Sequence, residues 1–134
     1  MAFAAGSRLG PYEVVSPLGA GAMGEVYRAR DPRLGREVAV KVISSDEAGQ
    51  AERQRRFEQE ARAVAALSHP NILAVHDVGS HGGTSYVVFE LLDGQTLLRR
   101  LERGPVPVRK ATEYGVQICQ GLAAAHREGS SIGT

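Results

Sequence analysis

The sequence predicts an α+β fold, in which an antiparallel sheet of five strands carries one helix and is followed by two further helices. Short segments that alternate apolar and polar residues occupy the N-terminal two thirds of the chain. A glycine-rich segment over residues 18–24 joins two of them and leads into a strand pattern, not into a helix. After Asp93-Gly94 the spacing of the apolar residues becomes helical. The 134 residues, 43% hydrophobic and 23% charged, are therefore expected to form one soluble globular domain or part of one.

Five segments are expected to form the sheet: residues 12–15, 25–30, 36–43, 72–75 and 86–92. In the third strand the valines at 38, 40 and 42 lie on one face, because successive side chains of a strand point to opposite sides. Lys41 therefore shares the other face with Ala39 and Ile43. The turn-rich run 79–84 joins the last two strands.

Three segments are expected to be helices. Residues 51–67 carry apolar side chains at helical spacing, and Pro70 stops this helix because the residue before a proline avoids the helical region. Two more helices are predicted over 96–103 and 109–127, separated by Gly104-Pro105. The apolar side of the last helix consists of Ala111, Gly115, Ile118, Leu122 and Ala125.

The glycine-rich segment has the spacing G-x-G-x-x-G at Gly19, Gly21 and Gly24. Glycine lets a backbone approach a ligand closely with its N–H groups directed inward, which suits the negative charge of phosphates. A nicotinamide-dependent oxidoreductase uses the same spacing, but there the last glycine opens a helix. Here Glu25-Val26 continues as a strand, so the segment is interpreted as a hairpin tip folded over a nucleotide.

Two charged residues are predicted to meet beside this hairpin. Glu60 falls on the apolar face of helix 51–67, and an ionised carboxylate there costs several kcal/mol unless it is paired. Lys41 is an ammonium on a strand face otherwise occupied by apolar residues. We expect the two to pair, which would hold the lysine where its charge meets the phosphates.

Five motifs together, in this order, resemble the eukaryotic-type Ser/Thr protein kinases, in particular the bacterial members. They are the glycine-rich loop, the strand Val38-Ala39-Val40-Lys41, the helix motif Phe57-Glu58-Gln59-Glu60-Ala61, the turn His69-Pro70-Asn71-Ile72 and the hinge strand 86–92. The resemblance implies that the chain binds ATP, that Lys41 contacts its phosphates and that Glu60 positions Lys41. Lys41 and Glu60 would be the catalytic residues that this sequence contains.

The same resemblance implies an adenine site between the sheet and the hinge. Leu18, Val26 and Ala39 would form an apolar roof, Phe89 would be the gatekeeper, and the backbone of Glu90 and Leu92 would face the base. The implied ATP-binding residues are Leu18, Gly19, Ala20, Gly21, Ala22, Met23, Gly24, Val26, Ala39, Lys41, Phe89, Glu90 and Leu92.

The resemblance covers only about half of the family's domain. Residues 1–10 are expected to be an N-terminal tail, 11–92 the small lobe with the ATP-binding loop and hinge, and 93–134 the start of a large lobe. The family's His-Arg-Asp loop, its downstream Asn and its Asp-Phe-Gly site have no counterpart, since the sequence ends in Ser130-Ser131-Ile132-Gly133-Thr134. The catalytic base and the Mg²⁺ ligands are thus absent here.

We therefore expect the ATP-binding part of a transferase that phosphorylates protein Ser/Thr, inactive by itself, with the apolar side of helix 109–127 left in water. One alternative is a non-catalytic, pseudokinase-like interaction module, in which nucleotide is incidental. Another is a fragment of a truncated or frame-shifted reading frame.

Charge and composition exclude several other classes of function. A formal net charge of +1 without a basic block argues against nucleic acid as a partner. The four histidines lack the spacing of a metal site, and no segment approaches the length of a membrane span. The single cysteine, Cys119, excludes an internal disulfide and fits a cytoplasmic location.

Overall fold

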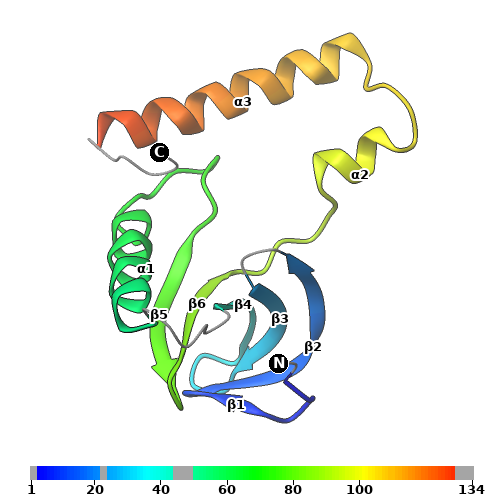
Figure 1. The fold of residues 1–134 in the computed structure, drawn as a ribbon. Helices are drawn as coiled ribbons and strands as arrows, with labels where there is room; N and C mark the ends of the chain where they lie inside the picture. The colour runs from blue at the N-terminus through cyan, green and yellow to red at the C-terminus, as the bar shows by residue number, and fades with distance from the viewer. Residues whose placement is uncertain (1–2, 22–23, 44–49, 129–134) are drawn as a thin grey trace.

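The computed structural model describes residues 3–21, 24–43 and 50–128 and has an antiparallel sheet with helices, which confirms the predicted fold class (Figure 1). The sheet order is β1-β2-β3-β4-β6-β5. The strands are β1 (Arg8–Leu9), β2 (Tyr12–Gly21), β3 (Gly24–Asp31), β4 (Arg36–Ile43), β5 (Val75–His81) and β6 (Thr84–Glu90). Within the described ranges the sheet thus has six strands where five were predicted, because β1 adds a short edge strand.

Strand β4 has the two faces that its alternation predicts. Val38, Val40 and Val42 are buried, with exposed fractions of 1%, 0% and 7%, whereas Ala39 and Lys41 on the opposite face are half-buried. The β3–β4 turn is closed by the Asp31 carboxylate, which accepts the Arg33 N–H at 3.0 Å, and by Gly35 at φ 64°. A local Asx-type bond and a glycine with positive φ explain why the chain reverses there.

Arg8 and Leu9 are part of the sheet and the segment before them is bonded to β2, so the prediction of a tail over 1–10 is wrong for the described residues 3–10. Leu9 in β1 is fully buried, and the Gly6 N–H donates to the Val14 carbonyl at 2.8 Å. The chain can double back between β1 and β2 because Gly10 has φ 58°, a conformation that favours glycine. Nothing in the local pattern of this segment signals a two-residue strand.

The prediction of a strand over 72–75 is also wrong, because β5 begins only at Val75. The preceding segment is held differently: the Ala74 N–H donates to the Glu90 side chain at 2.9 Å, and its carbonyl accepts the Glu90 N–H at 3.0 Å. The turn after β5 is shorter than expected, since Gly82 and Gly83 alone reverse the chain at φ 57° and 81°. Strand β6 accordingly starts earlier and ends at Glu90.

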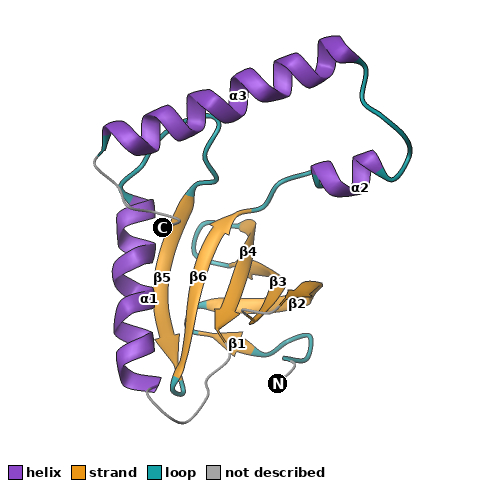
Figure 2. Cartoon of the chain, turned by 45° about the horizontal axis from the view of Figure 1, so that its top comes forward, coloured by secondary structure: helices purple, strands orange, loops and turns teal. Residues whose placement is uncertain are grey.

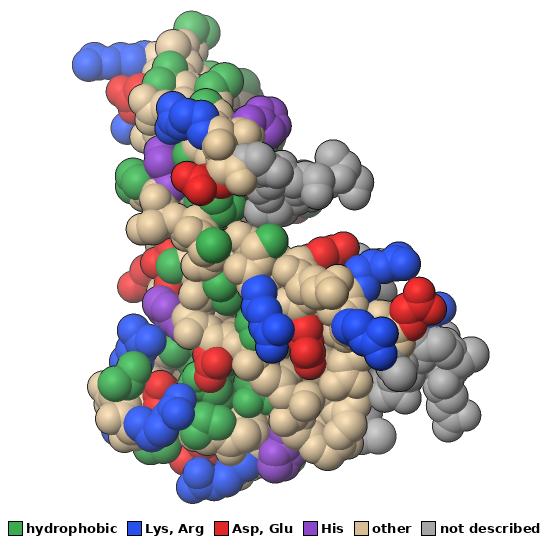
Figure 3. Space-filling view, turned by 90° about the vertical axis from the view of Figure 1, so that its left-hand side faces the viewer, with side chains coloured by type: hydrophobic (Ala, Val, Ile, Leu, Met, Phe, Trp, Pro, Cys, Tyr) green, Lys and Arg blue, Asp and Glu red, His purple; other side chains and the backbone are tan. Residues whose placement is uncertain are grey.

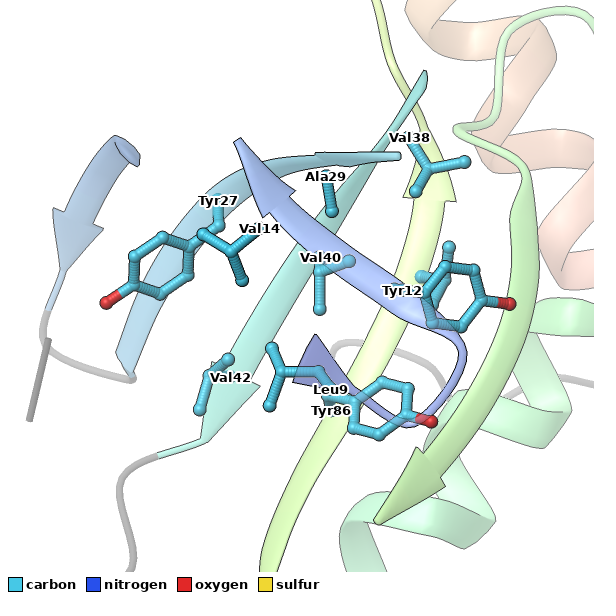
Figure 4. Close-up of a cluster of buried hydrophobic side chains, with 10 residues drawn as sticks. Leu9, Tyr12, Val14, Tyr27, Ala29, Val38, Val40, Val42 and Tyr86 are labelled. Atoms are coloured by element: carbon cyan, nitrogen blue, oxygen red, sulfur yellow. The ribbon is translucent and has the colours of Figure 1, made fainter. Parts of the chain in front are cut away.

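The core lies inside the curl of the sheet (Figure 4). Its buried members are Leu9, Tyr12, Val14, Tyr27, Ala29, Val38, Val40, Val42, Tyr86 and Val88. Tyr12 of β2 donates its hydroxyl to the Asp77 carboxylate of β5 at 2.6 Å, although the two strands are far apart in the sheet order. The same ring meets Tyr86 edge-on at 6.0 Å between centroids. The sheet is therefore curled until β2 meets β5.

The described helices are α1 (Gln50–Ala65), α2 (Leu97–Leu101) and α3 (Val108–Arg127), close to the predicted ranges. Helix α1 runs beside β5 and packs against β5 and, less extensively, β6, while α3 crosses the far end of the molecule (Figure 2). Gly121 is the one buried residue described in α3, so its apolar side is exposed as expected. The helices in the described ranges are too short or too polar to span a bilayer.

Candidate nucleotide-binding site

Five of the predicted site residues, Gly19, Val26, Ala39, Lys41 and Phe89, lie on the face of the sheet opposite to the core. Cross-strand register places Gly19, Val26, Lys41 and Val87 side by side in one row, from β2 to β6. A neighbouring row holds Ala39 beside Phe89. Since antiparallel partners share a face, residues from four strands converge on one surface. Val26, Ala39, Lys41 and Phe89 are all half-buried, which leaves that surface accessible to a ligand.

The described ends of the glycine-rich loop have the geometry of a close backbone approach. Strand β3 starts at Gly24, so no helix follows the third glycine, and the geometry of the nicotinamide-dependent alternative is absent. Gly24 has φ 139°, and a Cβ at this position would come within 1.9 Å of the Val42 carbonyl oxygen. Only glycine fits there. The predicted Ala22 and Met23 lie outside the described residues, and Ala20 and Gly21 are described only as part of β2.

The hinge segment follows β6 directly. Phe89 and Glu90 end the strand, and Leu92 is 66% exposed. The Glu90 carboxylate is turned toward the Ala74 N–H, which the sequence did not reveal, because the contact depends on where segment 72–74 runs. Leu18 at the other end of the site is half exposed. Leu18 and Leu92 thus present apolar surface toward solvent on either side of the site.

Lys41 and Glu60 are not paired in this structure. Within the described ranges no ion pair within 4.0 Å joins them, and Glu60 is exposed. The expectation that the Glu60 carboxylate is buried on the apolar face of its helix is therefore wrong. The reason is tertiary: α1 docks on β5, which stands two strands from β4, or about 10 Å at the usual strand spacing.

The two residues nonetheless lie on the same side of the sheet. Val87 points away from the core, beside Lys41, yet it is only 2% exposed. The cover on that side is α1, which packs against β5 and β6. A shift of α1 toward β4 would bring Glu60 closer to Lys41 without crossing the sheet.

A polar cluster lies on the core side, away from the candidate site. Burial raises the pKa of Tyr12 above its ordinary value, and the hydrogen bond to the Asp77 carboxylate raises it further. Burial also raises the pKa of Asp31, but the Arg33 guanidinium and backbone N–H outweigh it, so the pKa lies below its usual range. Arg33 spans the two, since it also approaches the Tyr12 hydroxyl at 3.3 Å. These groups close the curled sheet and do not face the ligand surface.

A cavity of about 500 Å³ opens beneath the hinge, between the sheet and the helices α2 and α3. The sequence predictions missed it, because its walls come from four separate segments. Apolar side chains dominate its lining, with a few polar groups, a composition typical of ligand pockets. The lining residues are Pro70, Asn71, Ile72, Leu73, Glu90, Leu92, Gln95, Thr96, Leu97, Arg100, Tyr114, Gln117 and Ile118.

The residues present fit ATP better than they fit a metal ion. The Gly24 backbone packs so closely on β4 that no side chain fits, which leaves its peptide groups uncovered by a side chain, and Lys41 supplies a cation on the same surface. In the described part of the chain, His, Cys, Asp and Glu side chains form no group of three or more that could hold a metal. The structure therefore offers no described Mg²⁺ site.

Comparison with known proteins identifies the family. Residues 12–131 match the family model described as the protein kinase domain. The serine/threonine-protein kinase PknB of Mycobacterium leprae is 44% identical over 123 residues, covering 88% of this chain but 20% of that protein. The serine/threonine-protein kinase pkn2 of Myxococcus xanthus is 40% identical over 120 residues, or 90% of this chain and 14% of that protein.

Solved structures agree with the sequence relatives. The kinase domain of Mycobacterium tuberculosis PknI superposes with a TM-score of 0.84 at 35% identity, over 96% of this chain and 52% of that one. The chain thus spans about half of the solved kinase domain, and a smaller share of the curated relatives. It belongs to the protein kinase domain family, alongside bacterial Ser/Thr kinases, and covers the N-terminal part of the domain.

Proposed function

We propose that this chain is the ATP-binding part of a Ser/Thr protein kinase domain. The observation that carries the proposal is the surface opposite the core, where Gly19, Val26 and Lys41 lie in one row next to Ala39 and Phe89. An apolar platform beside a cation and a glycine backbone suits a nucleotide, which has an apolar base and anionic phosphates.

Each residue has a distinct role in this proposal. Val26 and Ala39 cover the base, and the backbone of the hinge at Glu90 and Leu92 orients it. The N–H groups of the glycine-rich loop cradle the phosphates, which Lys41 neutralises in part. Glu60 positions Lys41 once α1 moves toward β4. ATP supplies the phosphoryl group when bound.

Phosphoryl transfer requires groups beyond these. In this family an Asp orients the acceptor hydroxyl, and an Asp and an Asn hold Mg²⁺. None has a counterpart among the 134 residues. We infer that these residues alone bind nucleotide without transferring phosphate, and that protein Ser/Thr is the acceptor in an intact kinase domain. A cytoplasmic location accords with the single cysteine.

Nucleotide titration tests the proposal. Calorimetry with ATP is expected to show one site, and Lys41→Met should weaken binding at least tenfold because a phosphate contact is lost. The matched control is Lys110→Met, which changes the chain's other lysine on the exposed surface of α3. Its affinity should match that of the unchanged chain. Absence of any ATP binding would overturn the proposal.

A phosphoryl-transfer assay tests the expected inactivity. Incubation with labelled ATP, Mg²⁺ and a generic protein acceptor is expected to give no transfer above background. Robust transfer that disappears in Lys41→Met would show that a catalytic base exists among these residues.

The rival function is a docking module for which nucleotide is incidental. The unpaired Lys41 and Glu60 favour it, since an assembled kinase site would join them. If it holds, Lys41→Met will leave the binding of a protein partner unchanged.

A further inference from the structure

A buried tyrosine lies directly behind the glycine-rich loop. Tyr27 belongs to β3, three residues after Gly24, and its ring is 2% exposed inside the core (Figure 4). Residues 24 and 27 lie on opposite faces of this strand, because side chains alternate. Tyr27 is therefore on the core side of the strand whose other side faces the candidate ligand surface.

The Tyr27 hydroxyl has two partners. It donates to the Glu25 carboxylate and accepts the Phe3 N–H at 3.0 Å. The Phe3 ring also meets the Tyr27 ring edge-on, with centroids 5.7 Å apart at 88°. One hydroxyl thus ties the N-terminal segment 3–9 to the residue that follows the third glycine.

The hydrogen bond from Tyr27 to Glu25 acts next to a conformationally restricted residue, Gly24. Glu25 is adjacent to Gly24, whose φ of 139° and close approach to the Val42 carbonyl leave no room for a side chain. In the register Glu25 pairs with Ala20 on one side and Val42 on the other. Holding the Glu25 side chain therefore restricts the peptide groups on either side of Gly24, which end the glycine-rich loop.

The hydroxyl keeps its proton across the neutral range. Burial raises the pKa of Tyr27, the bond to Glu25 raises it further, and the Phe3 N–H lowers it by less. A neutral hydroxyl can donate to the carboxylate and accept the N–H at the same time.

We propose that Tyr27 is a positioning residue for the phosphate-binding backbone at Gly24, which it holds from the core side of the sheet through Glu25 and the N-terminal segment. The inference rests on the proposed ATP binding. It assigns a function to residues 3–9, none of which is among the predicted site residues.

Comparison of ATP with adenosine tests this role, because only ATP carries phosphates. Tyr27→Phe keeps the ring and removes both hydrogen bonds. We expect its affinity for ATP to fall about five- to tenfold, less than two lost hydrogen bonds would give, because neither bond contacts the ligand directly. Its affinity for adenosine should stay within about twofold. Phe3→Ala removes the ring contact and leaves the backbone N–H, so it should shift ATP affinity in the same direction by less.

The matched control is Tyr12→Phe. Tyr12 is equally buried and its hydroxyl is also hydrogen-bonded, but to Asp77 at the other end of the strands. This variant should lose stability without changing the ratio of ATP to adenosine affinity. Equal losses for both ligands in Tyr27→Phe, or no loss for either, would overturn the positioning role.

A measurement without ligand separates this inference from the proposed function. Amide hydrogen exchange at residues 24–26 should be faster in folded Tyr27→Phe than in Tyr12→Phe or the unchanged chain. Unchanged exchange there refutes the tie whatever the chain binds. If the unchanged chain binds no ATP while exchange accelerates as expected, the proposed function fails and the backbone tie stands.

Discussion

The sheet and the helix α3 are stabilised in different ways, although both are regular secondary structure. The sheet encloses a core of side chains such as Leu9, Val40 and Val88, all fully buried. Helix α3 buries only Gly121 among its described residues, while Ile118 and Leu122 are more than half exposed. The space-filling view shows the sheet part below and the α3 part above, joined by a narrow waist (Figure 3).

This difference separates what local hydrogen bonding supports from what tertiary burial supports. Burying a large aliphatic side chain contributes about 1.5–3 kcal/mol, whereas an isolated helix is marginal in water. The sheet should therefore carry most of the free energy of unfolding. Helix α3 depends on its contact with the turn at Asn71 and on whatever else covers its apolar side.

The largest expected effect contrasts two leucines. Leu9→Ala, in the closed core, should lower the free energy of unfolding by about 2–5 kcal/mol, because it leaves a cavity that the sheet cannot fill. Leu98→Ala should change the free energy of unfolding by less than about 0.5 kcal/mol, because the Leu98 side chain in α2 is 74% exposed. Urea denaturation followed by circular dichroism measures both. Equal losses would contradict the difference in burial between the two side chains.

The next effect concerns closure of the sheet. Tyr12→Phe removes the bond to the Asp77 carboxylate and should cost about 1.5–3 kcal/mol at neutral pH. The Tyr12 pKa is raised in the folded protein, so its contribution to stability is complete below about pH 10 and is lost as the pH rises further.

Thermal melts between pH 7 and 11 follow this linkage. The unchanged chain should lose stability steeply at the alkaline end, and Tyr12→Phe less steeply. Parallel curves would mean that other groups control alkaline unfolding, such as Tyr86, whose pKa burial also raises.

A smaller effect tests the contact between α3 and the turn at Asn71. A Cβ at Gly121 would lie 2.9 Å from the Asn71 carbonyl oxygen, whereas at Gly115 it would meet nothing within 4 Å. Gly115→Ala should stabilise the protein by about 0.5–1 kcal/mol through helix propensity. Gly121→Ala should not stabilise the protein, because the added Cβ would force α3 away from the turn at Asn71. If both variants are stabilised equally, α3 does not rest on this contact.

The smallest effect on stability concerns the exposed side of α3. Ile118→Lys should leave the free energy of unfolding within about 0.5 kcal/mol, because the side chain is 53% exposed. It should, however, reduce self-association, which exposed apolar surface promotes. Size-exclusion chromatography is expected to show oligomers for the unchanged chain and more monomer for the variant. If the unchanged chain is monomeric, the expectation that the apolar side of α3 promotes self-association is wrong.

The predictions that were confirmed concern local properties. The two faces of β4 follow from alternation over a few residues, and the hairpin at Gly24 follows from the strand pattern at Glu25-Val26. The wrong predictions concern contacts between distant segments. The apolar run Ile72-Leu73-Ala74 predicts a strand. In the structure, however, the Ala74 N–H donates to the side chain of Glu90, sixteen residues away. Glu60 was predicted to be buried because its neighbours on the helix are apolar. It is exposed, because α1 docks on β5.

The sequence by itself determined the order of the motifs that resemble the protein kinases. It also determined the faces of the strands and the hairpin at Gly24, because alternation and glycine conformation are properties of the backbone within a few residues. Only the tertiary structure decided that Tyr12 meets Asp77, that Tyr27 joins Phe3 to Glu25, and that α1 stands apart from Lys41. Those outcomes depend on the curl of the sheet and on helix docking, which sum many weak contacts between residues far apart in the chain.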